Sequence, residues 1–342
     1  MLKNPAAGRN AFIAASLLNS LDGDFFRELS IDTNSQSEVP AYFGRCWGVY
    51  GLHLPGDIRS WETWKGPKKL TIGPPVYLDR PLYQYQYESL RWFDYWLKGV
   101  DTEIVDEQPI QLFIEGAGEW KSADQWPLPE TKWTPFFLHA DGLLSEHEFW
   151  PNEGASIFED SRYHHGELKF QTPPLRENTE ICGAIVLNLY ASTTDTEALW
   201  FISLWDIEAQ GDERLLTRGW LRGSQRQTDP ARSKPWQPYH VHTKRQPLTP
   251  NQTYEFNIEV RPYGILFEAG HRIGLKIKCA DDEPPPHALH AVGSGHIWRP
   301  SSSRLTVHHN AENPFHLLLP ITRGNRIGAF ISGGKLPPLA LP

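Results

Sequence analysis

The chain has few cysteines and no concentrated positive charge. Each of these absences excludes a class of protein. Three cysteines, Cys46, Cys182 and Cys279, are far apart and odd in number among 342 residues. They match neither a metal-binding motif nor a disulfide framework, so we expect buried thiols. The net charge is −8, and no run of Lys and Arg forms a basic patch. Because nucleic-acid binding needs phosphate neutralisation, we expect no nucleic-acid partner.

Long hydrophobic runs are also missing. No segment reaches the ~20 apolar residues of a membrane-spanning helix, so we expect no membrane partner. The run AFIAASLL at residues 11–18 is short for a signal peptide, and no small-x-small cleavage site follows it. A first amphipathic helix is the better interpretation of this run. The sequence leaves the localisation unknown, with the cytoplasm favoured.

Proline, glycine and aromatic residues are plentiful and spread along the chain, which is typical of short strands joined by turns. The first region, residues 39–98, alternates strand and helix patterns. Strands are predicted at 39–47 and 68–75, and Gly-Pro-Pro ends the second because proline cannot donate to a ladder. Helices are predicted at 54–64 and 87–98, so the order βαβα predicts a parallel α/β layer. Three apolar residues of the second helix share one stripe: Leu90, Phe93 and Leu97.

From about residue 108 the pattern changes to short strands with two-residue alternation. Many alternating strands separated by turn residues predict an antiparallel sandwich. The predicted fold class is therefore mainly β with an α/β portion. Long irregular stretches at 224–250 and 281–302 interrupt the strands. In two of the strands the apolar residues share one face and are expected to be buried: Phe256, Ile258 and Val260, and Ile273, Leu275 and Ile277.

Several long motifs occur in order along the chain, among them ESLRWFDYWLKGVDTEIVDEQPIQLFIEGAGEWKSADQWPLP, FFLHADGLLSE and LTVHHNAENPFHLLLPI. Together they resemble the CocE/NonD family of serine hydrolases, which includes cocaine esterase, α-amino-acid ester hydrolases and, more distantly, Xaa-Pro dipeptidyl-peptidases. The similarity covers roughly residues 22–321. It implies hydrolysis of acyl esters or amides as the activity of the family.

The resemblance also implies a C-terminal jelly-roll β-sandwich preceded by a partial α/β-hydrolase sheet. In this division residues 1–107 are the C-terminal remnant of the hydrolase domain. Residues 108–342 are a jelly-roll domain like the C-terminal domain of Xaa-Pro dipeptidyl-peptidases. The change of sequence pattern near residue 108 indicates the same division independently of the family resemblance.

A serine hydrolase of this fold needs a serine on a strand–turn–helix elbow, a histidine and a carboxylate. No G-x-S-x-G elbow lies between a strand and a helix here. The resemblance implies that Tyr77 stands at the histidine position, and a tyrosine with a pKa near ~10 is a poor proton shuttle at neutrality. Nothing acidic lies between Arg45 and Tyr50, where the family carries its acid. His53 and Asp57 are nearby candidates, but they fit better as a helix-start histidine and a first-turn helix residue.

Other histidines predict neither a metal site nor a cofactor. His240 and His242 alternate as strand ligands would, but zinc needs three or four ligands. In the stretch 281–302 we favour a solvated loop over a metal site. Acidic residues and histidines nevertheless gather there: Asp281, Asp282, Glu283, His287, His290 and His296.

Two functional interpretations remain. The first is part of a serine hydrolase, truncated or split and inactive alone. Its partner would be a complementary N-terminal hydrolase half, or a second copy bound through the incomplete sheet. The second is a non-catalytic ligand-binding or interaction module built on the jelly roll. Tryptophans in apparent loops motivate the second interpretation, although packing between domains is the more common role of such residues: Trp120, Trp126, Trp133, Trp150, Trp236 and Trp298.

Overall fold

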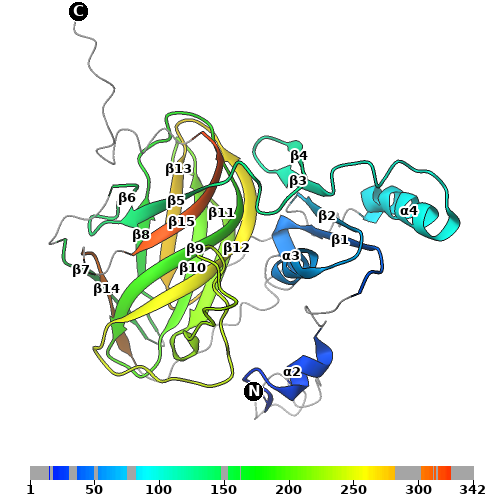
Figure 1. Ribbon diagram of the computed structural model, residues 1–342. Coiled ribbons are helices and arrows are strands. Elements are labelled where there is room, and N and C mark those ends of the chain that lie inside the picture. Colours follow the sequence, from blue (N-terminus) through cyan, green and yellow to red (C-terminus); the bar gives the residue numbers. More distant parts are fainter. Residues whose placement is uncertain are drawn as a thin grey trace, which may run out of the picture.

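The computed structural model contains a large curved β-sheet beside a small α/β layer (Figure 1). The predicted fold class, mainly β with an α/β portion, is confirmed. Part of the chain lies outside the described residues, including the start of the run at 11–18, Tyr77, Trp150 and Trp298. The structure describes residues 15, 18–30, 37–49, 53–74, 82–147, 153–161, 163–281, 302–310, 312 and 315–324.

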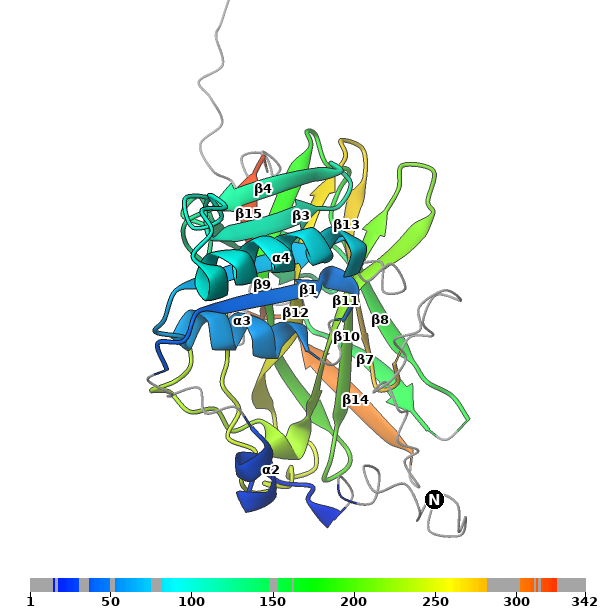
Figure 2. The same ribbon diagram turned by 90° about the vertical axis from the view of Figure 1, so that its right-hand side faces the viewer.

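The small sheet has the strand order β1-β2-β3-β4, in which the first three strands are parallel and β4 is antiparallel to β3. Its parallel strands and both helices confirm the predicted α/β layer. Helix α3 lies between the small and large sheets and buries one face, whereas α4 lies on the side away from the large sheet (Figures 1 and 2). The bounds are β1 Ala41–Cys46, α3 Leu54–Thr63, β2 Lys68–Gly73, α4 Leu82–Lys98, β3 Ile110–Ile114 and β4 Glu119–Ala123.

Helix α4 turns its predicted apolar stripe outward. Trp92 is buried, but Leu90, Phe93 and Leu97 are 53%, 55% and 76% exposed. The stripe therefore covers nothing within the described residues, and the helix meets the sheet through other side chains. Tyr42 of β1 packs against Trp92, with ring centroids 5.5 Å apart.

The large sheet is antiparallel throughout and contains eleven strands among the described residues. Its main path is β6-β5-β15-β9-β12-β11-β10-β13-β8, and β14 joins β7 to β9. The bounds are β5 Lys132–Leu138, β6 Leu144–Ser145, β7 Ala155–Asp160, β8 Glu167–Gln171, β9 Thr179–Thr193, β10 Leu199–Ile207, β11 Glu213–Arg222, β12 Tyr254–Phe267, β13 Arg272–Lys278, β14 Ser303–His308 and β15 His316–Arg323. Three further short helices are given bounds within the described residues: α2 Asp24–Leu29, η2 Trp47–Val49 and η3 Gly223–Gln225.

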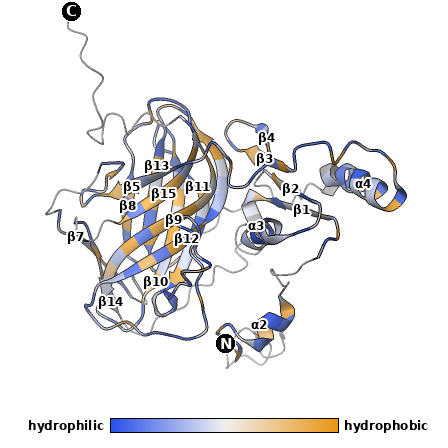
Figure 3. Cartoon of the chain, in the orientation of Figure 1, coloured by the Kyte–Doolittle hydropathy of each residue, from blue (hydrophilic) through white to orange (hydrophobic). Residues whose placement is uncertain are grey.

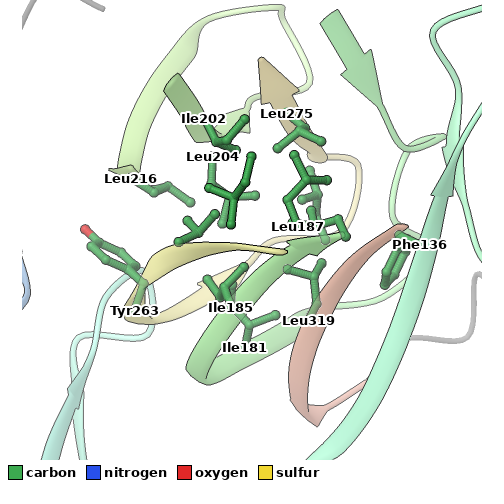
Figure 4. Close-up of a cluster of buried hydrophobic side chains, with 14 of the residues drawn as sticks. Phe136, Ile181, Ile185, Leu187, Ile202, Leu204, Leu216, Tyr263, Leu275 and Leu319 are labelled. Carbon is green, nitrogen blue, oxygen red and sulfur yellow. The ribbon is translucent and has the colours of Figure 1, made fainter. Parts of the chain in front are cut away.

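The large sheet curls around a core built from alternate residues of its strands (Figure 4). Hydrophobic and hydrophilic residues are interspersed along its strands (Figure 3). All six residues expected on buried faces of β12 and β13 are at most 1% exposed, so that prediction is confirmed. Cys46, Cys182 and Cys279 are buried outside any disulfide, as expected.

The two sheets are joined through the residue that follows β1. Trp47 has no exposed surface, and its Nε1 donates to the Phe113 carbonyl at 2.6 Å. Its ring lies against Tyr263 and Gly264 of β12. The Glu115 amide donates to the Gly264 carbonyl at 3.0 Å, so the end of β3 continues as a bridge to β12. Since β3 pairs with β2 and β4 pairs with β3, both strands belong to the small sheet, and a domain boundary after residue 107 stays a prediction.

Replacing Gly264 with alanine should lower the free energy of unfolding by about 1–3 kcal/mol, as overpacking of a filled core does. The new Cβ would lie 2.8 Å from Cζ2 of Trp47, whose indole is held by Phe113. Urea unfolding followed by tryptophan fluorescence measures the change. Gly44→Ala is the matched control, because its Cβ meets no atom within 4 Å. Equal losses in the two variants would contradict a packing role for Gly264.

Candidate functional site

Parallel strands present functional residues at their carboxyl ends, which in the small sheet are Cys46 of β1 and Gly73 of β2. The residue after β1, Trp47, is used for packing against the large sheet and offers no reactive group. Residues 75–81, which include Tyr77, lie outside the described residues. The described part of this edge therefore consists of the β1 end and the start of α3.

His53 and Asp57, the two candidates near this edge, both lie at the start of α3. His53 is exposed and precedes the helix, and Asp57 lies in its first turn. The Asp57 carboxylate forms an ion pair with Arg45 of β1. Burial raises the pKa of Asp57, while the charges of Arg45 and His53 oppose the rise. Asp57 lines one cavity with Ser89, but its carboxylate is engaged by Arg45 and anchors α3 to β1.

A cavity of about 400 Å³ lies between β1 and α4. Its polar walls include Tyr42, Tyr85 and Glu88 beside the Arg45–Asp57 pair. Burial raises the pKa of Tyr42 to about 12 and raises that of Tyr85 as well, so both phenols keep their protons near neutrality. Glu88 accepts a hydrogen bond from Arg91 at 3.1 Å. These side chains offer hydrogen-bonding groups to a ligand.

A serine, a histidine and a glutamate are hydrogen-bonded in series in the large sheet, a group that the sequence did not reveal. The Oγ of Ser145 lies 3.0 Å from Nε2 of His139, and Nδ1 of His139 lies 2.7 Å from Oε1 of Glu153. His139 and Ser145 flank the turn between β5 and β6 in the motif FFLHADGLLSE. Glu153 comes from beyond the motif, so only the folded chain brings the three together.

This series has a structural role rather than the role of a catalytic triad. Nε2 of His139 also faces the carbonyl oxygen of His147 at 3.2 Å. A carboxylate only accepts, so Nδ1 donates to Glu153 and Nε2 is left to accept from the Ser145 hydroxyl. The structural role therefore follows from burial and not from the tautomer of the ring. Ser145 is fully buried, which denies a substrate access to its oxygen. The three side chains fix the β5–β6 hairpin.

A second cavity, about 590 Å³, lies where β11 and β12 meet the segment before α2. His240 and His242 line it, with ring centroids 5.6 Å apart. Burial, followed by the charge of His242, lowers the pKa of His240 to about 4. Burial also lowers the pKa of His242, against the opposing charge of Asp22. Both rings are thus disposed to be neutral at pH 7.

Arg261 forms the cationic wall of this cavity. Its guanidinium lies 4.9 Å from the Trp220 ring centroid, and its NH1 donates to Oε2 of Glu259 at 3.0 Å. Glu259 also accepts from NH2 of Arg59 at 2.8 and 2.7 Å. Two arginines therefore share one carboxylate here. Burial and the charge of Arg59 lower the pKa of Arg261, while Glu259 opposes the change.

No group of three or more His, Cys, Asp and Glu side chains gathers as metal ligands within the part of the chain that the structure describes. The histidines at 287, 290 and 296 lie outside that part. No helix of the described residues is long and apolar enough to cross a bilayer.

Residues 102–317 match the family described as the X-Pro dipeptidyl-peptidase C-terminal non-catalytic domain. The matched segment is more than half of the chain. The chain belongs to this family. The His139 series and the His240 cavity of this X-Pro dipeptidyl-peptidase C-terminal domain both draw on residues inside the matched segment.

The chain is also similar to longer proteins that are described as esterases or hydrolases. A Mycobacterium bovis protein described as a serine esterase is 27% identical over 261 residues, covering 67% of this chain and 41% of that protein. The cocaine esterase of a Rhodococcus species is 21% identical over 276 residues, covering 68% and 45%. A CocE/NonD family hydrolase from Staphylococcus aureus has a similar crystal structure. Its TM-score is 0.80 at 21% identity, covering 92% of this chain and 59% of that one.

The expected relationship with CocE/NonD hydrolases is confirmed. The similarity covers the C-terminal portion of these proteins. The chain spans less than half the length of the curated relatives that it matches. The likeness to the solved structure reaches beyond residues 102–317 and includes most of the chain, so the fold is shared there as well.

Ser145→Ala should lower the free energy of unfolding by about 1–3 kcal/mol, because buried groups of His139 and His147 lose a hydrogen-bond partner. Chemical denaturation measures this loss. The exposed Ser122 is the matched control, and Ser122→Ala should change stability by less than about 0.5 kcal/mol. A fluorophosphonate probe should not label Ser145. Labelling at this residue would contradict the structural role.

His240 should make the protein less stable in acid. Its pKa falls from 6.5 to about 4 on folding, so the unfolded chain takes up the proton first and stability drops as the pH falls between these values. A shift of this size corresponds to on the order of 3 kcal/mol. His240→Gln should flatten the curve of unfolding free energy against pH in that window. The charged groups facing the ring are Glu259 and Arg59, and the titratable His242 lies beside it. Parallel curves for the two proteins would contradict the prediction.

Proposed function

We propose that this chain serves as the non-catalytic C-terminal part of a CocE/NonD-type serine hydrolase and is inactive alone. The hydrolysis of acyl esters or amides then requires a hydrolase segment that supplies the nucleophilic serine. The observation that carries this proposal is the free edge of β1. Among the described strands, β1 pairs with β2 only, although it belongs to a parallel sheet.

An unpaired strand edge offers backbone donors and acceptors to a further strand. Parallel sheets are normally covered and continued, so the edge of β1 suits another parallel strand. The cavity between β1 and α4 lies beside this edge, and Phe93 of the outward stripe lines it. The edge, the cavity and the stripe together form what we term the β1 face. We propose a hydrolase segment as its occupant, because the matched hydrolases are longer than this chain and share its parallel strands.

The residues at the β1 end support inactivity of the chain alone. An acid and a histidine of a serine hydrolase must be aligned with a nucleophile. Here the carboxylate of Asp57 is paired with Arg45, and the sequence has no nucleophile elbow. Tyr77 stands at the position that the family resemblance assigns to histidine. A hydrolase segment would therefore have to supply the nucleophilic serine. The catalytic base of the assembled site would have to be a residue other than Tyr77, and without such a residue the site would be inactive.

The purified chain should hydrolyse p-nitrophenyl butyrate no faster than buffer and take up no fluorophosphonate probe. It should bind a hydrolase segment of a CocE/NonD relative that ends before the strand matching β1. Phe93→Glu should weaken that binding by at least tenfold, because it places a charge on the apolar part of the β1 face. Ile157→Glu is the matched control, since Ile157 is 57% exposed and lies on β7. Light scattering and calorimetry measure the association.

Several outcomes would contradict this proposal. Turnover by the lone chain that a serine-directed inhibitor blocks would overturn its inactivity. A dimer that Phe93→Glu dissociates would make a second copy of the chain the occupant of the β1 face. Equal binding by both glutamate variants would place the contact elsewhere.

A second candidate function is a non-catalytic module in which the jelly roll binds a small ligand. It is favoured by the cavity at His240, where polar atoms are buried without hydrogen-bond partners in the described residues. This function needs no serine nucleophile and no hydrolase segment. Binding of a small molecule to the lone chain would support it.

A further inference from the structure

We infer that the His240 cavity binds a small zwitterion with an apolar side chain, such as a free aromatic α-amino acid. This inference rests on the second candidate function and gives its ligand. It depends on the separation of opposite charges across the cavity and on two buried polar atoms that face no partner.

The cavity has the dimensions of a small-molecule site. Its volume of about 590 Å³ lies within the range of roughly 300–1,000 Å³ that such sites span. One wall comes from the segment before α2, which is held by a hydrogen bond from the Asp22 amide to the His242 carbonyl at 2.9 Å. The opposite wall comes from β11 and β12. Apolar surface is supplied by Phe26, Trp220 and Leu221.

Arg261 provides a position for a carboxylate. Its Nε is buried and has no hydrogen-bond partner among the described residues, whereas its NH1 is held by Glu259. Because Arg59 draws on the same carboxylate, the positive charge of Arg261 is only partly balanced. Trp220 fixes the plane of the guanidinium. Nε makes no hydrogen bond that an incoming carboxylate would have to displace, but it is closed off from solvent, so the guanidinium must shift to present it to the ligand.

His240 provides an acceptor for a donor group on the ligand. The ring is neutral near pH 7 and bonds to the backbone of Asn257 through one nitrogen. Its Nε2 is buried and has no partner among the described residues. In a neutral imidazole one nitrogen donates and the other accepts. Since a backbone carbonyl takes the ring hydrogen, Nε2 is left as an acceptor, which an ammonium group would satisfy.

Asp22 supplies the negative charge that an ammonium requires. It lies on the exposed rim, and its charge acts on His242. Glu259 and Arg59 act on both Arg261 and His240, so they do not distinguish the two sides of the cavity. The distinction comes from the lining, in which Asp22 belongs to the segment before α2 and Arg261 belongs to β12. The remaining cation of the lining, Arg222, is paired with Glu197 at 3.5 Å. A zwitterion matches both sides, whereas a simple anion or cation leaves one of them unmatched.

Calorimetry on the whole chain tests this assignment with four probes of one shape. They are phenylalanine, 3-phenylpropionate, phenethylamine and 2-phenylethanol. Phenylalanine should bind at least about tenfold more tightly than either singly charged probe, because each of these lacks one charge-assisted hydrogen bond. The neutral alcohol should bind most weakly.

Two variants separate the two sides of the cavity. Asp22→Asn should weaken phenylalanine binding about tenfold and leave 3-phenylpropionate unchanged. Arg261→Gln should weaken phenylalanine binding by a similar factor and leave phenethylamine unchanged. Because Arg261 is also part of a buried ion pair, its variant is used only if its unfolding curve remains cooperative. Asp22 is exposed, so Asp22→Asn decides the question even if Arg261→Gln fails to fold.

Similar affinities for all four probes, or phenylalanine binding that Asp22→Asn leaves unchanged, would overturn the zwitterion assignment. Binding of the alcohol or a singly charged probe without phenylalanine would also overturn it, but would still support a ligand-binding module. Absence of binding by any of the four probes would count against both the zwitterion assignment and the ligand-binding function. Ester hydrolysis enters none of these measurements, so they are independent of the hydrolase proposal.

Discussion

The structure depends on the packing of Trp47 between the two sheets. The indole is fully buried, donates to the Phe113 carbonyl and lies against Gly264, where no side chain could be accommodated. A tryptophan buries a large apolar area while its N–H still finds a partner. Because this residue follows β1 directly, the end of a parallel strand that could carry catalytic groups is used for packing. The small sheet is thereby held against the large one at a fixed position.

A chain of polar contacts surrounds this junction. Glu115, at the end of β3, accepts from Tyr263 and pairs with Arg214, which also binds Asp206 at 3.0 Å. Nδ1 of His271 then lies 2.8 Å from Asp206. Buried ion pairs contribute little net stability, but removing one member leaves an uncompensated charge. The series therefore favours one arrangement of β3 against β10 to β13, while apolar burial supplies most of the stability.

Among the described residues, the small α/β layer has one side that packs against the large sheet and one side that is exposed to solvent. Along the junction, α3 buries its apolar residues, and Arg59 on that helix pairs with Glu259 of β12. On the other side, β1 has an unpaired edge and α4 shows its apolar stripe to solvent. Apolar surface exposed beside a strand edge is a common feature of surfaces that bind protein. The proposed ligand cavity lies apart from that face, so a partner and a small ligand could bind together.

Local periodicity in the sequence was enough to predict the fold class, the α/β layer and the buried faces of β12 and β13, since alternation fixes which face of a strand is apolar. It also placed Leu90, Phe93 and Leu97 on one stripe of α4, but only the tertiary structure decided that this stripe faces outward. The same holds for both polar clusters. His139 meets Glu153, and His240 and Arg261 line one cavity, because the folded chain brings together residues that are separated in sequence. Periodicity describes one element at a time, whereas these contacts depend on how several elements pack.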